Sequence, residues 1–145
     1  MECQFPEVNT PVERLGEIFS QVRVIAVVGL SPDETKDSYR VASYLQQAGF
    51  KIVPIYPKEE MILGEKVYRS LEEIPFAIDM VDVFRKADVL PEIVASIKKR
   101  GDVKVLWTQV GIVNNEAARE AEAAGVTVVQ SRCAMVEHRR LGGGV

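Results

Sequence analysis

Basic and hydroxyl-bearing side chains recur where the short apolar runs of this sequence end. The run 24–28 is followed by Gly29, Ser31, Thr35 and Lys36, just ahead of a predicted helix. Free backbone N–H groups at a helix N-terminus, the helix dipole and a nearby cation together form an anion site. We therefore expect this turn to hold a phosphate group.

The turn after residue 28 differs from the known nucleotide-binding fingerprints. Gly29 is its only glycine, whereas the G-x-G-x-x-G motif needs three, and the Gly-Lys-Ser/Thr of a P-loop is absent. The next predicted strand, 51–56, ends in Tyr56, Pro57 and Lys58, where an NAD site would place an acidic residue against the ribose. A cation there fits a ribose that carries a phosphate, and the tyrosine and proline offer apolar faces to an adenine ring.

The later strand ends repeat the pattern, with Arg85 after the third predicted strand and Arg132 after the fifth. A ligand with several phosphates would explain cations at one edge of a chain whose net charge is −3. Weak exposed ion pairs are the alternative explanation, because acidic residues surround Lys36. The residues expected to bind the ligand are Gly29, Ser31, Lys36, Ser38, Arg40, Tyr56, Pro57, Lys58, Phe84, Arg85, Gln109 and Gly111.

A catalytic centre is harder to find. Cys133 is a candidate nucleophile, but a catalytic thiol usually needs a base, and the single histidine, His138, lies five residues further on. We expect Cys133 to be a packed residue and His138 to lie on a solvated tail beside Arg139 and Arg140. One histidine and two distant cysteines offer no metal-ligand spacing, so the sequence predicts no metal site and no catalytic constellation.

Two acidic residues and the single tryptophan have structural explanations. Asp79 and Asp82 are three residues apart on a predicted strand, so they point to opposite faces and cannot form a catalytic pair. We expect Asp79 to accept backbone donors at the start of its strand. Trp107 is expected to pack in the core.

Short β-branched runs alternate with helical patterns, which predicts an α/β fold. We expect a doubly wound, three-layer domain with a mainly parallel five-stranded sheet and an N-terminal helix over 11–21. Pro54 should make the second strand irregular, since proline cannot donate to a sheet ladder. The expected strands are 24–28, 51–56, 78–84, 103–107 and 126–129, and the expected helices after the first are 37–49, 88–100 and 116–124.

Length and composition fit one ordinary domain. The chain has 145 residues, of which 47% are hydrophobic and 27% charged, so we expect a single domain over 1–145 with frayed ends at 1–10 and 141–145. The mildly acidic balance gives no general attraction to nucleic acid or an anionic membrane. No apolar run approaches the roughly 20 residues of a membrane span, and no signal peptide is recognisable. Two distant cysteines make no disulfide framework, which favours the cytoplasm.

Several segments together resemble a known family, the small stand-alone CoA-binding proteins, which are related to the CoA-binding domain of the succinyl-CoA synthetase alpha subunit. The resemblance implies a Rossmann-like domain that binds coenzyme A, with phosphates at the first loop, the adenosine part near 56–58, and Phe84 and Arg85 near the pantetheine or pyrophosphate. It covers one domain of the synthetase, so synthetase activity is not implied. The matching segments are Gly29-Leu30-Ser31, Lys36-Asp37-Ser38-Tyr39, 54–58, 79–85, 107–111 and Arg132-Cys133.

The sequence therefore favours a protein that binds coenzyme A or a short acyl-CoA without catalysis of its own. NADP carries a comparable ribose phosphate, so an NADP-binding reductase-like enzyme is an alternative, although the three-glycine turn is missing. A Cys133-dependent acyl-CoA transferase is a further alternative, and so is a CoA-sensing module that acts on a protein partner. A homodimer is also compatible with the sequence.

Overall fold

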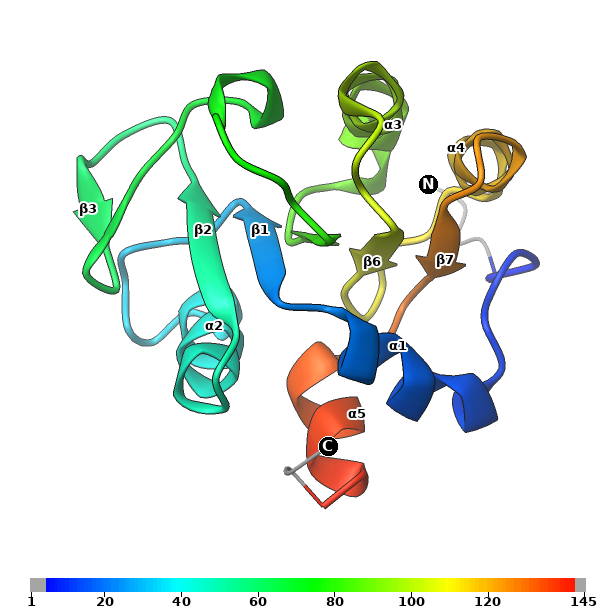
Figure 1. Ribbon diagram of the computed structural model, residues 1–145, viewed down its shortest axis with the longest axis horizontal. Helices are drawn as coiled ribbons and strands as arrows, with labels where there is room; N and C mark the ends of the chain where they lie inside the picture. The colour runs from blue at the N-terminus through cyan, green and yellow to red at the C-terminus, as the bar shows by residue number, and fades with distance from the viewer. Residues whose placement is uncertain (1–4, 143–145) are drawn as a thin grey trace.

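The computed structural model describes residues 5–142, which form a parallel sheet with helices on both faces (Figure 1). The five strands lie in the order β2-β1-β5-β6-β7, and every neighbouring pair is parallel. This confirms the doubly wound α/β fold. The strands are β1 (Val24–Val28), β2 (Lys51–Ile55), β5 (Met80–Val83), β6 (Val105–Thr108) and β7 (Thr127–Val129).

The helices divide between the two faces of the sheet (Figure 1). One face is covered by α3 (Leu90–Arg100) and α4 (Asn115–Ala123), and the other by α1 (Leu15–Gln21), α2 (Asp37–Gln47) and α5 (Ala134–Arg140). The shorter elements are the 3-10 turns η1 (Val12–Arg14), η2 (Leu71–Glu73) and η3 (Ala87–Val89) and the small hairpin of β3 (Met61–Ile62) and β4 (Glu65–Lys66).

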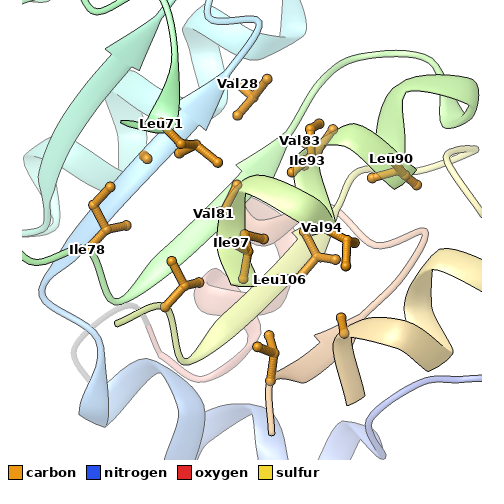
Figure 2. Close-up of a cluster of buried hydrophobic side chains, with 14 of the residues drawn as sticks. Val28, Leu71, Ile78, Val81, Val83, Leu90, Ile93, Val94, Ile97 and Leu106 are labelled. Carbon is orange, nitrogen blue, oxygen red and sulfur yellow. The ribbon is translucent and has the colours of Figure 1, made fainter. Parts of the chain in front are cut away.

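Each face of the sheet has its own apolar layer, because successive strand residues point in opposite directions. Val28 joins the layer under α3 and α4, whereas its neighbour Val27 joins the layer under α1, α2 and α5. Burial on both faces explains why β1 is a continuous apolar run rather than an alternating one. Figure 2 shows the first layer, where Val81, Val83 and Leu106 of the sheet meet Leu90, Ile93, Val94 and Ile97 of α3.

Pro54 does not interrupt β2, contrary to the expectation of an irregular strand. It pairs in register with Val27, and β2 is the edge strand of the sheet. The carbonyl oxygen of Pro54 accepts the N–H of Tyr68 at 2.9 Å on the outer side of the edge. In a parallel strand the N and the carbonyl of one residue face the same side. The missing N–H of Pro54 therefore lies on the outer side, where β1 does not need it.

The amino-terminal segment 5–10, which was expected to be frayed, is hydrogen-bonded to the first residue of α4, Asn115. The side-chain amide of Asn115 donates to the Phe5 carbonyl at 2.7 Å and accepts the Glu7 N–H at 2.9 Å. Thr10 is buried as well. The predicted fraying over 1–10 is therefore wrong for residues 5–10, and residues 1–4 lie outside the described part of the chain.

The strand order creates a switch point between β1 and β5. The chain leaves β1 for α2 on one face and leaves β5 for α3 on the other. The carboxyl ends of these two adjacent strands thus open into a crevice, which is where doubly wound sheets bind ligands. The predicted binding residues follow these strand ends.

Candidate functional site

The loop after β1 is shaped by its own polar side chains. Ser38 Oγ accepts the N–H of Ser31 at 3.0 Å, and Ser31 Oγ accepts the N–H of Asp33 at 3.0 Å. Thr35 donates both its N–H and its hydroxyl to Asp33, and the hydroxyl bond is the main reason that the pKa of Asp33 is lowered. The sequence predicted hydroxyl groups of this loop as ligands of an anion. In the structure their hydrogen bonds within the loop hold its conformation.

The N-terminus of α2 opens at the end of this loop. Its cap residue, Lys36, has an extended backbone, and the Lys36 side chain makes no capping hydrogen bond to the described part of the chain. The first-turn N–H groups and the positive end of the helix dipole are therefore available to an anion. Lys36 is exposed and forms no ion pair within residues 5–142. Arg40 pairs with Asp37, so its charge is already partly compensated.

Gly29 and Arg85 meet at the switch point. Gly29 has a φ of +87°, and a Cβ at this position would lie 3.0 Å from Cδ of Arg85 and 3.3 Å from the carbonyl oxygen of Phe84. The aliphatic stem of Arg85 therefore crosses the backbone of Gly29, while the residue as a whole remains exposed. Only a glycine allows this close approach at a positive φ.

The end of β2 is held by a residue that the sequence did not single out. Nη1 of Arg69 donates to the carbonyl oxygens of Tyr56 at 2.9 Å and Lys58 at 2.8 Å. This clamp fixes the segment 56–58 and leaves the Lys58 side chain exposed. Arg69 lies in the loosely patterned stretch after β2, where no periodicity or motif marks it.

Two hollows flank the switch point. The first has a volume of about 190 Å³ and lies between the ends of β1 and β2 and the helix α3. The second has a volume of about 260 Å³ and lies between α2, the start of α5 and the ends of β5 and β6. The first is lined by Val28, Ile55, Arg69, Arg85 and Ile93, among others, and the second by Arg40, Val41, Phe84, Gln109, Ile112, Cys133 and Met135, among others.

A larger hollow of about 500 Å³ lies away from the carboxyl edge, beside Arg100. The guanidinium of Arg100 donates to the carbonyl oxygens of Leu71, Ile74 and Phe76 and to Asp102. These bonds use the donors of the arginine to tie η2 and its following loop to α3. The Arg100 side chain beside this hollow is thus engaged in holding the fold together. We therefore place the functional site at the carboxyl edge of the sheet.

Gln109 is more buried than a loop ligand would be, because it is tied to Asp82. Its Nε2 donates to Oδ1 of Asp82 at 2.6 Å, inside the protein. The other oxygen, Oδ2, has no hydrogen-bond partner in the described part of the chain, and burial raises the pKa of Asp82 to about 7. The feature of the sequence that could have drawn attention to Asp82 is an acidic residue within an otherwise apolar strand that is buried on both faces.

Asp79 and Trp107 behave as expected. Asp79 Oδ2 accepts the N–H groups of Arg23 at 2.9 Å and Val24 at 3.0 Å, at the start of β1. Trp107 is fully buried, and its Nε1 donates to the carbonyl oxygen of Arg132 at 2.8 Å. Both residues support the fold.

Two expectations for the end of the chain are wrong. Arg132 does not join the cations of the edge, because its Nη1 donates to the carbonyl oxygen of Thr10 at 2.6 Å. His138 does not lie on a solvated tail: it is 1% exposed, its Nδ1 is 2.8 Å from the hydroxyl of Tyr44, and burial lowers its pKa. Aromatic rings pack around it, so His138 belongs to the core under α5.

Gly111 and Cys133 complete the edge. Gly111 has a φ of +87° and donates its N–H to Ser131 Oγ at 3.0 Å. Cys133 is half-buried and free, and it lines the 260 Å³ hollow.

Within residues 5–142 there is no group of three His, Cys, Asp or Glu side chains that could hold a metal ion. The same residues contain no helix long and apolar enough to cross a membrane.

The fold and the site define a class of protein. A doubly wound parallel sheet of this order is a Rossmann-like domain, a fold class that commonly binds nucleotides at the carboxyl edge. Comparison with known families makes the assignment specific. Residues 23–139 match the CoA binding domain family, and the chain belongs to that family.

Three relatives show the range of proteins that share this domain. The uncharacterized protein YneT of Bacillus subtilis is 37% identical over 130 residues, which cover 90% of this chain and 96% of YneT. A hypothetical protein of Pyrococcus horikoshii has a solved structure that matches with a TM-score of 0.88 and 39% identity, covering 97% of this chain and 99% of that one. The alpha subunit of an ADP-forming acetate–CoA ligase from Pyrococcus furiosus is 27% identical over 127 residues, which cover 81% of this chain and 28% of the subunit.

Proposed function

We propose that this protein binds coenzyme A, or a short acyl-CoA, at the carboxyl edge of its sheet and carries out no chemistry on it. The observation that carries the proposal is the contact between Gly29 and Arg85. The stem of Arg85 lies against Gly29 at the end of β1, in a chain of the CoA binding domain family whose next helix, α2, has no side-chain hydrogen bond from its cap residue. CoA carries a pyrophosphate and a 3′-phosphate, and both need such a setting.

The two hollows suggest how the ligand lies. The pyrophosphate would face the α2 N-terminus, with Lys36 and Arg85 as its cations. The 3′-phosphate would lie toward Lys58, whose backbone is held by Arg69, so the nucleoside falls on the β2 side. The 190 Å³ hollow beside Ile55 is on that side. The pantetheine arm would then extend the other way, into the 260 Å³ hollow.

The geometry around Cys133 supports binding rather than catalysis. The histidine that could act as its base is packed among aromatic rings, and its Nδ1 is engaged by Tyr44. A thiol nucleophile without a base is a weak one. Because Cys133 is a free thiol, we also propose that the protein works in the reducing cytoplasm.

Calorimetric titration tests this proposal against NADP. We expect CoA to bind with a stoichiometry of one per chain, and NADPH to bind far more weakly, because the turn after β1 has one glycine where a dinucleotide turn has three. Acetyl-CoA should be recovered intact after incubation with the protein. Tight NADPH binding without CoA binding would contradict the proposal, and so would release of free CoA from acetyl-CoA that is abolished in Cys133→Ala.

A further inference from the structure

Asp82 occupies a position that the fold alone does not favour. It lies on β5 in register with Val27 on one side and Trp107 on the other, and its side chain is fully buried. One of its two oxygens has no hydrogen-bond partner among the residues the structure describes. Burying a carboxyl group without full pairing costs free energy, and an apolar residue of similar size would cost less. The side chain therefore needs another explanation.

The contact that Asp82 does make determines how the Gln109 amide is turned. Gln109 Nε2 donates to Asp82 Oδ1 at 2.6 Å, and Oδ1 accepts this bond whether the carboxyl group is ionised or carries a proton on Oδ2. The nitrogen of the planar amide must therefore face Asp82, and Oε1 must face away from it. The backbone of Gln109 is fixed as well, since its N–H donates to the carbonyl oxygen of Val83 at 3.2 Å.

Gln109 lines the 260 Å³ hollow, and because its Nε2 faces Asp82, we place its Oε1 on the hollow side. This oxygen accepts no hydrogen bond from another described residue, and it is not closed off from solvent. Around it the hollow is mostly apolar, with Val41, Phe84 and Met135 in its wall. The charged groups at its rim, Asp37 and Arg40, pair with each other. The hollow thus suits a neutral, largely apolar arm that carries a hydrogen-bond donor.

We propose that Asp82 is a positioning residue that turns the Gln109 amide so that Oε1 accepts a hydrogen bond from an amide N–H of the ligand's pantetheine arm. This inference rests on the proposed binding of CoA. Asp82 acts only through Gln109 and does not touch the ligand. This orientation makes the hollow selective for an arm with a hydrogen-bond donor near Gln109. An arm without a donor would cover Oε1 and leave this acceptor unpaired.

The test separates the arm from the nucleotide. CoA and adenosine 3′,5′-bisphosphate share the phosphorylated nucleoside, so the ratio of their dissociation constants measures what the arm contributes. In Asp82→Leu the amide loses its partner and can rotate, and we expect the arm's contribution to fall about three- to ten-fold. Binding of the bisphosphate should not change. Asp82→Asn keeps an acceptor oxygen for Nε2 and should restore most of the arm's contribution.

A double-mutant cycle tests whether Asp82 acts through Gln109. Gln109→Leu should lower the arm's contribution by a similar factor, and Asp82→Leu/Gln109→Leu should lower it no further. The inference is overturned if Gln109→Leu leaves the ratio unchanged, if the two losses multiply, or if Asp82→Leu weakens both ligands equally. Gln109→Leu and Asp82→Asn decide the matter even if Asp82→Leu does not fold. Failure of the wild-type protein to bind either ligand would instead contradict the proposed function.

Discussion

The substitution Gly29→Ala tests the close approach at the switch point. Gly29 has a φ of +87°, and the added Cβ would lie 3.0 Å and 3.2 Å from Cδ and Cγ of Arg85 and 3.3 Å from the Phe84 carbonyl oxygen. The arginine stem can move away, but the carbonyl belongs to the backbone at the end of β5. We therefore expect both a loss of stability and a displaced Arg85.

Gly125→Ala is the matched control for this substitution. Gly125 has the same φ of +87°, but no atom of residues 5–142 lies within 4 Å of its added Cβ, and it follows α4 away from the site. The positive φ should cost each variant about 1–2 kcal/mol of unfolding free energy. The contacts at Gly29 should add about 1 kcal/mol more, as mild overpacking does. Urea unfolding of the two variants measures this difference.

Binding provides the sharper comparison. If Arg85 faces a phosphate, moving it removes a charge-assisted hydrogen bond of about 1.5–3 kcal/mol, which weakens CoA binding by about ten- to a hundred-fold. Gly125→Ala should bind CoA as the wild type does. Calorimetry on both folded variants decides the point. Equal CoA affinity in Gly29→Ala and Gly125→Ala would refute the reasoning, because the contact with Arg85 would then have no role in the site.

The other predictions concern single side chains. Lys58→Ala should weaken CoA about three- to ten-fold and leave dephospho-CoA unaffected in calorimetry; an equal loss for both ligands would remove Lys58 from the 3′-phosphate. Lys36→Ala should weaken CoA about two- to five-fold and reduce the salt dependence of binding; an unchanged salt slope would mean that this lysine faces only solvent. Arg69→Ala should release the Tyr56 and Lys58 carbonyls and weaken CoA about three-fold or more without greatly changing its salt dependence, which a titration at two salt concentrations would check. Burial raises the native pKa of Asp82 to about 7, whereas an unfolded Asp has a pKa near 4, so the wild type loses stability as pH rises from about 4 to 7. Asp82→Asn should therefore gain stability relative to the wild type between pH 5 and pH 8 in urea unfolding, and an equal difference at both pH values would contradict the burial argument.

Local patterns were sufficient to predict the main elements. The apolar run 24–28 is β1 to the residue, because a strand covered on both faces has no polar alternation. The helix expected over 88–100 ends at Arg100 as predicted, because Gly101 follows it in the left-handed conformation with a φ of 76°. Since the carboxyl ends of parallel strands share one edge, the sequence predicted Gly29 and Arg85 at the same edge, and the strand order of the structure makes them neighbours.

Long-range pairing was not visible in the sequence. His138 was interpreted as part of a polar tail because two arginines follow it, yet its partner Tyr44 is 94 residues away. Arg132 was counted among the edge cations, yet it binds the carbonyl of Thr10, 122 residues away. The sequence shows the charge of a side chain and its neighbours along the chain. The packing of distant elements determines which partners its polar atoms bind.

The details at the edge depend on backbone carbonyls and burial. Arg69 binds two carbonyl oxygens, which every residue has, so no residue type on the other side of the contact could reveal it. Asp82 was considered only as a partner for Asp79, because its full burial and its bond to Gln109 appear only once β5 and β6 are paired. Whether Pro54 would disturb β2 depended on which side of that strand is the free edge of the sheet. The sequence does not reveal the strand order, so this could not be predicted.

An NMR titration of the amide-labelled protein with CoA tests most directly whether this domain binds CoA at the carboxyl edge. We predict that the largest amide shifts fall on Gly29, Lys36, Lys58, Arg85 and Gln109, and that the amides around Arg100, at the 500 Å³ hollow, stay in place. Absence of shifts at saturating CoA, or shifts centred on Arg100, would contradict it.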